Sequence, residues 1–424
     1  MVRISLNLKS PQVRQTVSLF SATILSIFLN LIINIVLSKL LGPKGLGDFR
    51  FIITILTIFT TIFSFGFYQA TGRLIVLSND PKEIREIYGA STFVTLILYT
   101  FLVIFLFIYF IFDRNINNKG LFSYVYIIVI FGWVFLTRTL LEATLPSSSH
   151  IGLLALSRSV QPLVLLLFII PFLYLNIINY DFNITKFALI LNFISFVIVY
   201  LFVIFKLKLS FKRLRKRFKD IVQMNKDFGL NVYIGGLIPL VVASLSEVLI
   251  SYTSADNTGV GFYSIAVSLC SLISIFPRII ASVAYKQFAV QNEMPKNILF
   301  AAVSLGILTL IFLLLMIKPF VFYFYGQEFS TVIKLCYILS IGIFFHGLAD
   351  LLNKYLGANG EGKLLRNSSV LVGISLLSLN ITLIPIYGEF GAVIAASISG
   401  IIYFNTMYYY YKKSIHANTD GAQS

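Results

Sequence analysis

Long apolar runs recur along the whole chain, and they restrict the folds that it can adopt. A helix that crosses a bilayer needs about 20 mostly apolar residues, and twelve segments of the sequence reach that length. They are 16–40, 49–72, 89–112, 121–145, 151–177, 184–206, 228–253, 259–285, 297–317, 330–356, 365–386 and 390–411. Membrane barrels instead need short segments in which apolar and polar residues alternate. The sequence therefore predicts an all-α integral membrane protein with about twelve transmembrane helices.

The composition supports lipid as the solvent of this chain. Of 424 residues, 58% are hydrophobic and only 12% are charged, whereas soluble domains carry about 25% charged residues. The net charge of +16 would point to nucleic acid in a soluble protein, but no soluble basic domain remains to bind it, so we expect no nucleic-acid partner. Cys270 and Cys336 lie inside apolar runs and form no metal-binding spacing, so we predict no metal site.

The basic residues are distributed unevenly between the two sides of the predicted spans. With the N-terminus in the cytoplasm, the cytoplasmic segments hold 22 Lys and Arg residues and the external segments hold six. Cytoplasmic loops of membrane proteins carry an excess of basic residues, and one missed span would scramble this alternation. The asymmetry therefore predicts twelve spans with both termini in the cytoplasm.

The densest basic segment, 206–219, has the sequence KLKLSFKRLRKRFK and lies between the sixth and seventh predicted spans. One interpretation is an amphipathic helix on an anionic membrane leaflet. The other is a linker that fixes the topology and joins two halves of the chain. Of the two, we favour the linker.

Short motifs on either side of this segment indicate an internal duplication. Gly45-Leu46-Gly47-Asp48-Phe49 lies between spans one and two, and Gly259-Val260-Gly261-Phe262-Tyr263 lies between spans seven and eight, at an offset of 214 residues. Three further pairs share an offset of 208 residues, so that one small insertion or deletion separates the two sets. These pairs are Glu142 with Asp350, Arg158 with Arg366, and Arg138 with His346.

The duplication predicts two six-helix bundles, 1–205 and 228–424, joined by a basic cytoplasmic linker, 206–227. Both bundles begin on the cytoplasmic side, so they are parallel repeats related by an axis along the membrane normal. Transporters are often built in this way and hold their substrate between the repeats, near the midplane of the bilayer. We therefore expect a transporter with a central cavity.

Charged residues within the spans are candidates for the substrate site, because each is costly there unless it faces a cavity or a partner. The cations are Arg50, Arg138, Arg158, Arg278 and Lys334, and the acids are Glu142, Glu247 and Asp350. The cations outnumber the acids by five to three. This excess suits an anionic substrate better than a cationic one.

The four in-span arginines are the predicted binding residues for an anionic headgroup. Arg138, Arg158 and Arg278 lie in the cytoplasmic third of their predicted helices, and a guanidinium offers phosphate a planar fork of donors. Simpler roles remain open. Arg138 and Glu142 are spaced to form an i,i+4 salt bridge, Arg278 could extend to the membrane surface, and Arg50, near the outer face, could anchor its helix there.

The three acids are candidates for ion coupling. A carboxylate removed from water binds a proton more readily, so Glu142, Glu247 or Asp350 could exchange H⁺ or Na⁺ during transport. The alternative is a polar contact between helices. We predict no other cofactor, because the motif Gly357-x-x-x-x-Gly362-Lys363 follows an apolar helix and continues with leucine where a phosphate-binding loop needs Ser or Thr. No catalytic residue is predicted either.

An ordered series of motifs resembles the polysaccharide repeat-unit flippases of bacteria, the O-antigen and capsule branch of the MATE/MOP transporter superfamily. The first motif is Leu41-Gly42-Pro43-x-Gly45-x-Gly47-x-Phe49, and its span ends near Phe65-Gly66. The others are Val260-Gly261-Phe262-Tyr263-Ser264-x-Ala266, Tyr325-Gly326-Gln327-Glu328-Phe329, Ala358-Asn359-Gly360 and Leu383-Ile384-Pro385-x-x-Gly388-x-x-Gly391-Ala392. The series covers most of the chain, in order.

The resemblance implies a fold of two six-helix bundles around a central cavity, and transport by alternating access. It implies a polyprenyl-pyrophosphate-linked oligosaccharide as substrate, moved from the cytoplasmic to the outer leaflet of the bacterial cytoplasmic membrane. Membrane lipids, and the polymerase and chain-length proteins of the same pathway, are the implied partners. The resemblance transfers no site residues, because this branch has no site motif that aligns with the chain.

Two other functions are weighed against this one. A MATE-type exporter of drugs or cations would favour an acidic, aromatic cavity, which the in-span cations oppose. A membrane enzyme, such as a polysaccharide polymerase, would need a sizeable external loop, but the longest connection is the basic cytoplasmic segment 206–227. We therefore expect a transporter and not an enzyme.

Overall fold

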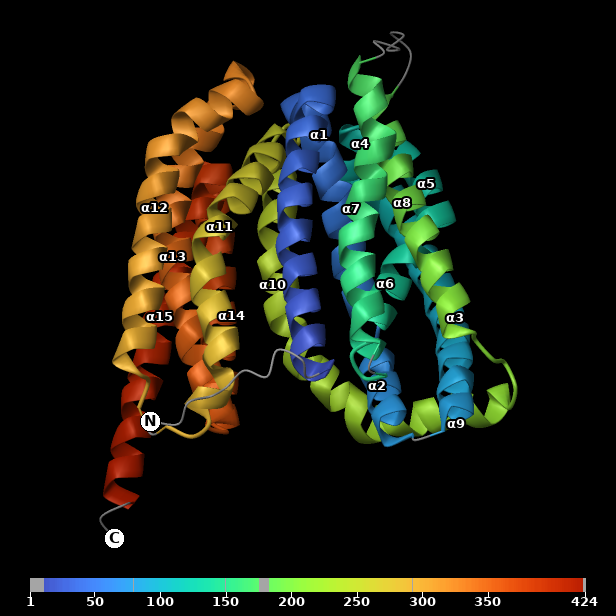
Figure 1. Ribbon diagram of the computed structural model, residues 1–424. Coiled ribbons are helices and arrows are strands. Elements are labelled where there is room, and N and C mark those ends of the chain that lie inside the picture. Colours follow the sequence, from blue (N-terminus) through green and yellow to red (C-terminus); the bar gives the residue numbers. More distant parts are fainter. Residues whose placement is uncertain (1–10, 79, 149, 175–182, 292, 422–424) are drawn as a thin grey trace. The chain divides into compact units, whose positions relative to one another are not determined.

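The protein is almost entirely helical in the computed structural model, which describes residues 11–421 except 79, 149, 175–182 and 292. Every regular element in these described ranges is a helix (Figure 1). Among the described residues, nine helices are long and apolar enough to cross a membrane, and there are ten such spans if the bent pair Leu121–Phe131 and Trp133–Thr144 counts as one. The all-α membrane fold predicted from the apolar runs is confirmed.

The long helix α1 (Pro11–Phe63) contains the first predicted span and most of the second. Gly42 interrupts it with φ 64° and ψ 179°, a conformation that costs glycine little and other residues much. Pro43 follows and lacks the N–H that would continue the helix. After this kink a second helical stretch follows, which ends at Phe63 before the short α2 (Phe67–Leu77). The predicted span 49–72 therefore runs across a break at residues 64–66.

The remaining helices match the other predicted spans within a few residues at most ends. Those up to residue 207 are α3 (Pro81–Phe112), α4 (Arg114–Asn118), the 3₁₀ turn η1 (Leu121–Tyr124), α5 (Val125–Phe131), α6 (Trp133–Thr144), α7 (Ile151–Tyr174) and α8 (Ile184–Leu207). Those after it are α9 (Leu214–Met224), the π-turn η2 (Asn225–Gly229), α10 (Leu230–Thr253), α11 (Thr258–Phe288), α12 (Lys296–Phe324), η3 (Gln327–Phe329), α13 (Ser330–Ala358), α14 (Gly362–Tyr387) and α15 (Glu389–Gly421). Residues 175–177, at the end of the predicted fifth span, lie outside the described residues.

The chain forms two compact units. Unit 1 consists of Met1–Leu41 and Ile52–Leu237, and unit 2 of Gly42–Phe51 and Ile238–Ser424. These boundaries differ from the predicted bundles in two places. The basic segment 206–227, expected to be a linker, packs inside unit 1, and the short segment Gly42–Phe51 packs inside unit 2.

Unit 1 is held together by a core that joins five of its helices, α2, α3, α6, α7 and α8. Ile75 of α2, Tyr88 of α3, Leu141 of α6 and Tyr200 of α8 are buried in one cluster. Tyr88 also donates a hydrogen bond to the backbone oxygen of Thr144 at 3.2 Å. This packing places the amino-terminal end of α3 beside α2, α6 and α9.

In unit 2, α13 is the central helix and packs against α11, α12, α14 and α15. Gly42–Phe51 joins this unit through a very close backbone approach. A Cβ on Gly47 would lie 1.7 Å from the backbone oxygen of Asn257, and one on Gly261 would lie 2.5 Å from the backbone oxygen of Pro43. Asn257 also donates a hydrogen bond to Asp48 at 2.7 Å. The two glycine motifs matched at an offset of 214 residues are thus packed against each other.

Candidate functional site

Three helices of unit 2 bring a cluster of charged and polar side chains together. The Nε of Arg278 on α11 donates to the Oδ2 of Asp350 on α13 at 2.7 Å. The Nδ1 of His346 lies 3.5 Å from the same oxygen, because residues four apart share one face of a helix. Tyr403 on α15 donates to the Oδ1 of Asp350 at 3.3 Å. Asn353 in turn donates to the hydroxyl of Tyr403 at 3.0 Å, so that Asp350 lies at the centre of the cluster.

This cluster is partly open although it belongs to apolar helices. The side chains of Arg278 and His346 are 52% and 39% exposed, and that of Asp350 is 22% exposed. A guanidinium is costly in hydrocarbon and is found within membranes where it faces water, a polar ligand or a partner. Because Asp350 covers only one edge of the guanidinium fork, Arg278 retains donors that can bind an oxyanion.

Unit 1 contains a simpler version of the same arrangement. Arg138 and Glu142 on α6 form a salt bridge of 3.0 Å, and their side chains are 52% and 40% exposed. The guanidinium of Arg138 also lies 5.5 Å from the ring centre of Phe196 on α8. The salt bridge considered from their spacing is therefore present. The exposed edge of the Arg138 guanidinium still has donors free for a ligand. Arg138 and Glu142 are the residues matched to His346 and Asp350 at an offset of 208.

Arg158 and Arg50 have different surroundings. Within the part of the chain that the structure describes, Arg158 on α7 forms no ion pair. Arg50 interacts electrostatically with Glu247 and with Tyr325 in unit 2, and its Nε is buried. The role of surface anchor considered for Arg50 does not fit a buried Nε. Glu247, which has no basic neighbour in the sequence, interacts with Arg50.

Each of the three predicted coupling acids therefore has an arginine beside it. The pairs are Arg138 with Glu142, Arg278 with Asp350, and Arg50 with Glu247. The arginines expected as a surplus near the cytoplasmic side are in fact paired in two of three cases, Arg138 and Arg278. Tyr403 and Asn353 were not predicted as site residues. Asn353 lies three residues after Asp350 on α13, a spacing that the sequence alone could have revealed, whereas Tyr403 lies on α15 and had no sequence signal.

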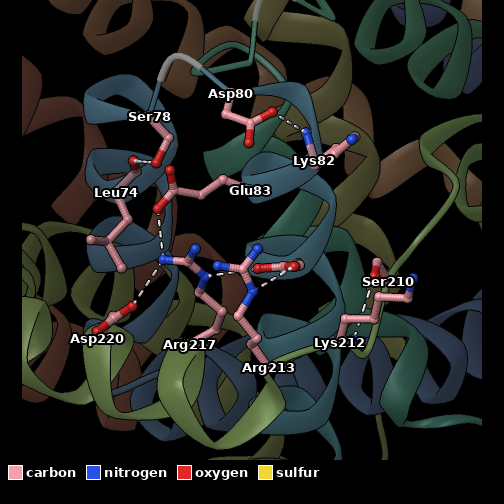
Figure 2. Close-up of polar contacts among 11 residues, drawn as sticks. Leu74, Ser78, Asp80, Lys82, Glu83, Ser210, Lys212, Arg213, Arg217 and Asp220 are labelled. Atoms are coloured by element: carbon pink, nitrogen blue, oxygen red, sulfur yellow. Dashed lines mark hydrogen bonds and ion pairs between the residues drawn. The ribbon is translucent and has the colours of Figure 1, made fainter.

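A second ionic cluster fixes the basic segment to unit 1, outside the predicted spans. Arg217 of α9 donates through Nε to Glu86 at 3.1 Å, and through Nη1 to Glu83 at 2.6 Å and to Asp220 at 3.1 Å. Arg213 adds a contact of 3.3 Å to Glu86. Figure 2 shows Arg213 and Arg217 side by side, with Glu83 and Asp220 on either side of the Arg217 guanidinium. Glu83 and Glu86 of α3 thus bind α9 through two arginines, and Asp220 of α9 itself completes the cluster.

The charge of Arg217 is maintained although its side chain is only 8% exposed. Burial alone lowers the pKa of a guanidinium, but the hydrogen bond that Arg217 donates to Glu86 and the charges of Glu83 and Asp220 outweigh it, so the pKa of Arg217 is raised. Glu86 is 4% exposed and depends on Arg217 for its main charge partner. The cluster therefore explains why the basic segment packs as part of unit 1 rather than as a free linker.

Comparison with known proteins agrees with this fold. A family model described as "Polysaccharide biosynthesis protein" matches residues 12–285. The capsular polysaccharide biosynthesis protein CapF of Staphylococcus aureus is 22% identical over 409 residues, which cover 93% of this chain and 98% of that protein.

Solved structures show the same fold at low sequence identity. The lipid II flippase MurJ, in an inward closed conformation, has a TM-score of 0.73 at 15% identity and covers 95% of this chain and 89% of its own. A multidrug resistance MATE family transporter of the MOP superfamily, in an inward-facing conformation, has a TM-score of 0.71 at 15% identity. The match covers 95% of this chain and 99% of that transporter. The predicted MATE-like fold is confirmed.

Proposed function

The chain belongs to the polysaccharide biosynthesis protein family, as its ordered motifs predicted, and we propose that it is a flippase for a polyprenyl-pyrophosphate-linked oligosaccharide. The proposed direction is from the cytoplasmic to the outer leaflet of the bacterial cytoplasmic membrane, by alternating access, with both termini in the cytoplasm. The protein is a MATE-like multi-span membrane protein of the MOP superfamily type. Its substrate, direction and orientation are the proposal.

The observation that supports this substrate best is the pair of half-exposed arginines in apolar helices. Arg278 and Arg138 each have one edge held by a carboxylate and the rest of the guanidinium open. Pyrophosphate oxygens match those free donors in charge and geometry. The carboxylates keep each site near neutrality until the headgroup arrives, which lowers the cost of a charge among apolar helices. Arg158, without an ion pair in the described residues, is a third candidate ligand.

The coupling ion in this proposal is H⁺ or Na⁺, and Asp350 is its best candidate site. An incoming phosphate competes with Asp350 for Arg278, and a carboxylate that loses its cation binds a proton more readily. Glu142 stands in the same relation to Arg138. Glu247 is the remaining candidate and interacts with Arg50. Transport that is unchanged in the Asp350→Asn, Glu142→Gln and Glu247→Gln variants would reject coupling through these acids.

The binding role of Arg278 is tested by glycan export in cells that lack their own flippase for the same glycan. Arg278→Ala removes charge-assisted bonds worth about 1.5–3 kcal/mol, so we expect export to fall about tenfold to a hundredfold. Arg278→Lys should recover only part of it, because an ammonium lacks the planar fork. Arg114→Ala removes an exposed arginine outside the predicted spans and serves as the matched control.

A structural role for Arg278 is separated from a binding role by the double variant Arg278→Ala/Asp350→Asn. This variant leaves no unpaired charge, so it should fold and reach the membrane. The proposal requires that it still fail to export glycan. Full export by the double variant would show that Arg278 serves only to neutralise Asp350.

A further inference from the structure

Helix α9 and the turn before it carry more positive charge than the carboxylates around them neutralise. Arg213 and Arg217 are held by Glu83, Glu86 and Asp220. Four other basic side chains of this segment are exposed and form no ion pair with any residue that the structure describes. They are Lys212, Arg215, Lys216 and Lys219, and together they form the basic row of this segment.

An apolar row runs along α9 beside these charges. Leu214, Phe218 and Val222 are spaced four residues apart, so they share one face of the helix, and all three are only partly buried. The ring of Phe218 lies 6.2 Å from that of Phe93 on α3, and Phe93 is 37% exposed. The row therefore continues onto the exposed apolar surface of a membrane-spanning helix, which lipid covers.

The basic row borders the apolar row directly. Arg215 and Lys219 each follow a member of the apolar row by one position, which places them about 100° further around the helix. Phe211, in the turn before α9, is 57% exposed and extends the apolar row. An apolar face flanked by Lys and Arg is the pattern of helices that lie in the membrane interface.

The ionic cluster sets the rotation of α9. Arg217 and Ile221 are buried on the face toward unit 1, and Figure 1 shows α9 running across the lower ends of α2 and α3. Because Arg217 is held by Glu83 and Glu86 of α3, the helix cannot turn its basic row inward. Its apolar row is held against α3 and its basic row is held at the level where the spans begin.

We propose that α9 is an interfacial helix that binds the phosphate headgroups of anionic phospholipids through Lys212, Arg215, Lys216 and Lys219. Its apolar row inserts among the upper acyl chains, next to Phe93. The headgroups supply the negative charge that the protein itself does not offer these four side chains. Each basic residue near an anionic surface contributes measurably to such binding, and this function is independent of the transported substrate.

The test compares lipid retention by the full-length protein in micelles that contain equal amounts of phosphatidylglycerol and phosphatidylcholine. Native mass spectrometry counts the lipids bound to the wild type and to a variant with Lys212→Gln, Arg215→Gln, Lys216→Gln and Lys219→Gln. We expect the apparent affinity for phosphatidylglycerol to fall at least tenfold, equivalent to about 1.4 kcal/mol, with phosphatidylcholine unchanged. The matched control removes four exposed lysines of unit 2 and should lose little. These are Lys354, Lys363, Lys412 and Lys413.

Retention of phosphatidylglycerol at the wild-type level by the quadruple α9 variant would overturn the proposal, and so would an equal loss in the control. Either result would indicate that the basic row binds a soluble acidic partner instead of lipid headgroups. A salt titration of the unmodified protein gives a second test that needs no variant. Raising the ionic strength from about 0.1 M to about 1 M shortens the screening length from about 10 Å to about 3 Å, so the preference for phosphatidylglycerol should decline. A preference that does not change with salt contradicts headgroup binding.

Discussion

Replacing Arg217 with methionine removes the guanidinium that contacts all three carboxylates of the α9 cluster. Glu86 is 4% exposed and keeps only the contact of 3.3 Å to Arg213, whose side chain is 61% exposed. Breaking a buried ion pair typically costs about 3–5 kcal/mol. Because Glu83 and Asp220 are each about one-third exposed, water can solvate them, and we expect the lower end of that range, about 3 kcal/mol.

The cost should appear as local opening of α9. Since about 1.4 kcal/mol corresponds to a factor of ten in an equilibrium constant, amide hydrogens of Leu214–Met224 should exchange about a hundredfold faster in Arg217→Met. Hydrogen exchange measured by mass spectrometry on the full-length protein in detergent gives this rate. In Arg217→Met/Glu86→Gln no buried carboxylate is left unpaired, so most of the protection should return. Lys216→Met, on the exposed face, is the control.

Two outcomes would refute this reasoning. Wild-type exchange in Arg217→Met would show that the cluster contributes nothing to the packing of α9. Exchange in the double variant that is as fast as in Arg217→Met would show that the loss does not arise from an unpaired Glu86. In either case the helix would owe its position to its apolar contacts, such as that between Phe218 and Phe93.

Two further substitutions test the packing and the polar cluster of unit 2. Gly47→Ala would place a methyl group 1.7 Å from the backbone oxygen of Asn257, so it should lower the thermal unfolding temperature. Gly152→Ala, whose methyl group would point into open space, is the control and should not lower it. Equal unfolding temperatures for the two variants would contradict the close approach. Tyr403→Phe removes a hydrogen bond to Asp350 worth about 1 kcal/mol, so glycan export should fall less than in the variant that lacks Arg278. An equal or greater loss would assign the tyrosine a direct contact with substrate.

The sequence predicts the limits of most helices well, because a bilayer imposes a minimum length on each apolar run. Of the twelve predicted spans, the described residues give nine, or ten if the bent pair is one span. The sequence pattern does not predict a helix break that depends on backbone conformation. The predicted span 49–72 is broken at Phe65 and Gly66, which have φ values of 43° and 81°. Neither residue changes the apolar pattern, so hydropathy could not reveal the break.

The candidate site was predictable only where its members are close in the sequence. Arg138 and Glu142 follow from the i,i+4 rule alone. The pair Arg278 and Asp350 joins α11 to α13 across 72 residues, and it depends on how both helices are rotated in the bundle. The same limit applies to the basic segment, since the link from Arg217 to Glu86 spans 131 residues.

The most direct test of the proposed function is translocation by the purified protein in liposomes. A polyprenyl-pyrophosphate oligosaccharide with a fluorescent label on its sugar is incorporated into both leaflets, and a membrane-impermeant reagent quenches the label outside. If the chain is a flippase for this class of lipid, label from the inner leaflet should become accessible to the quencher in liposomes with the wild-type protein. It should remain protected in liposomes with Arg278→Ala/Asp350→Asn. Equal protection with the wild type, the double variant and empty liposomes would contradict the proposed function.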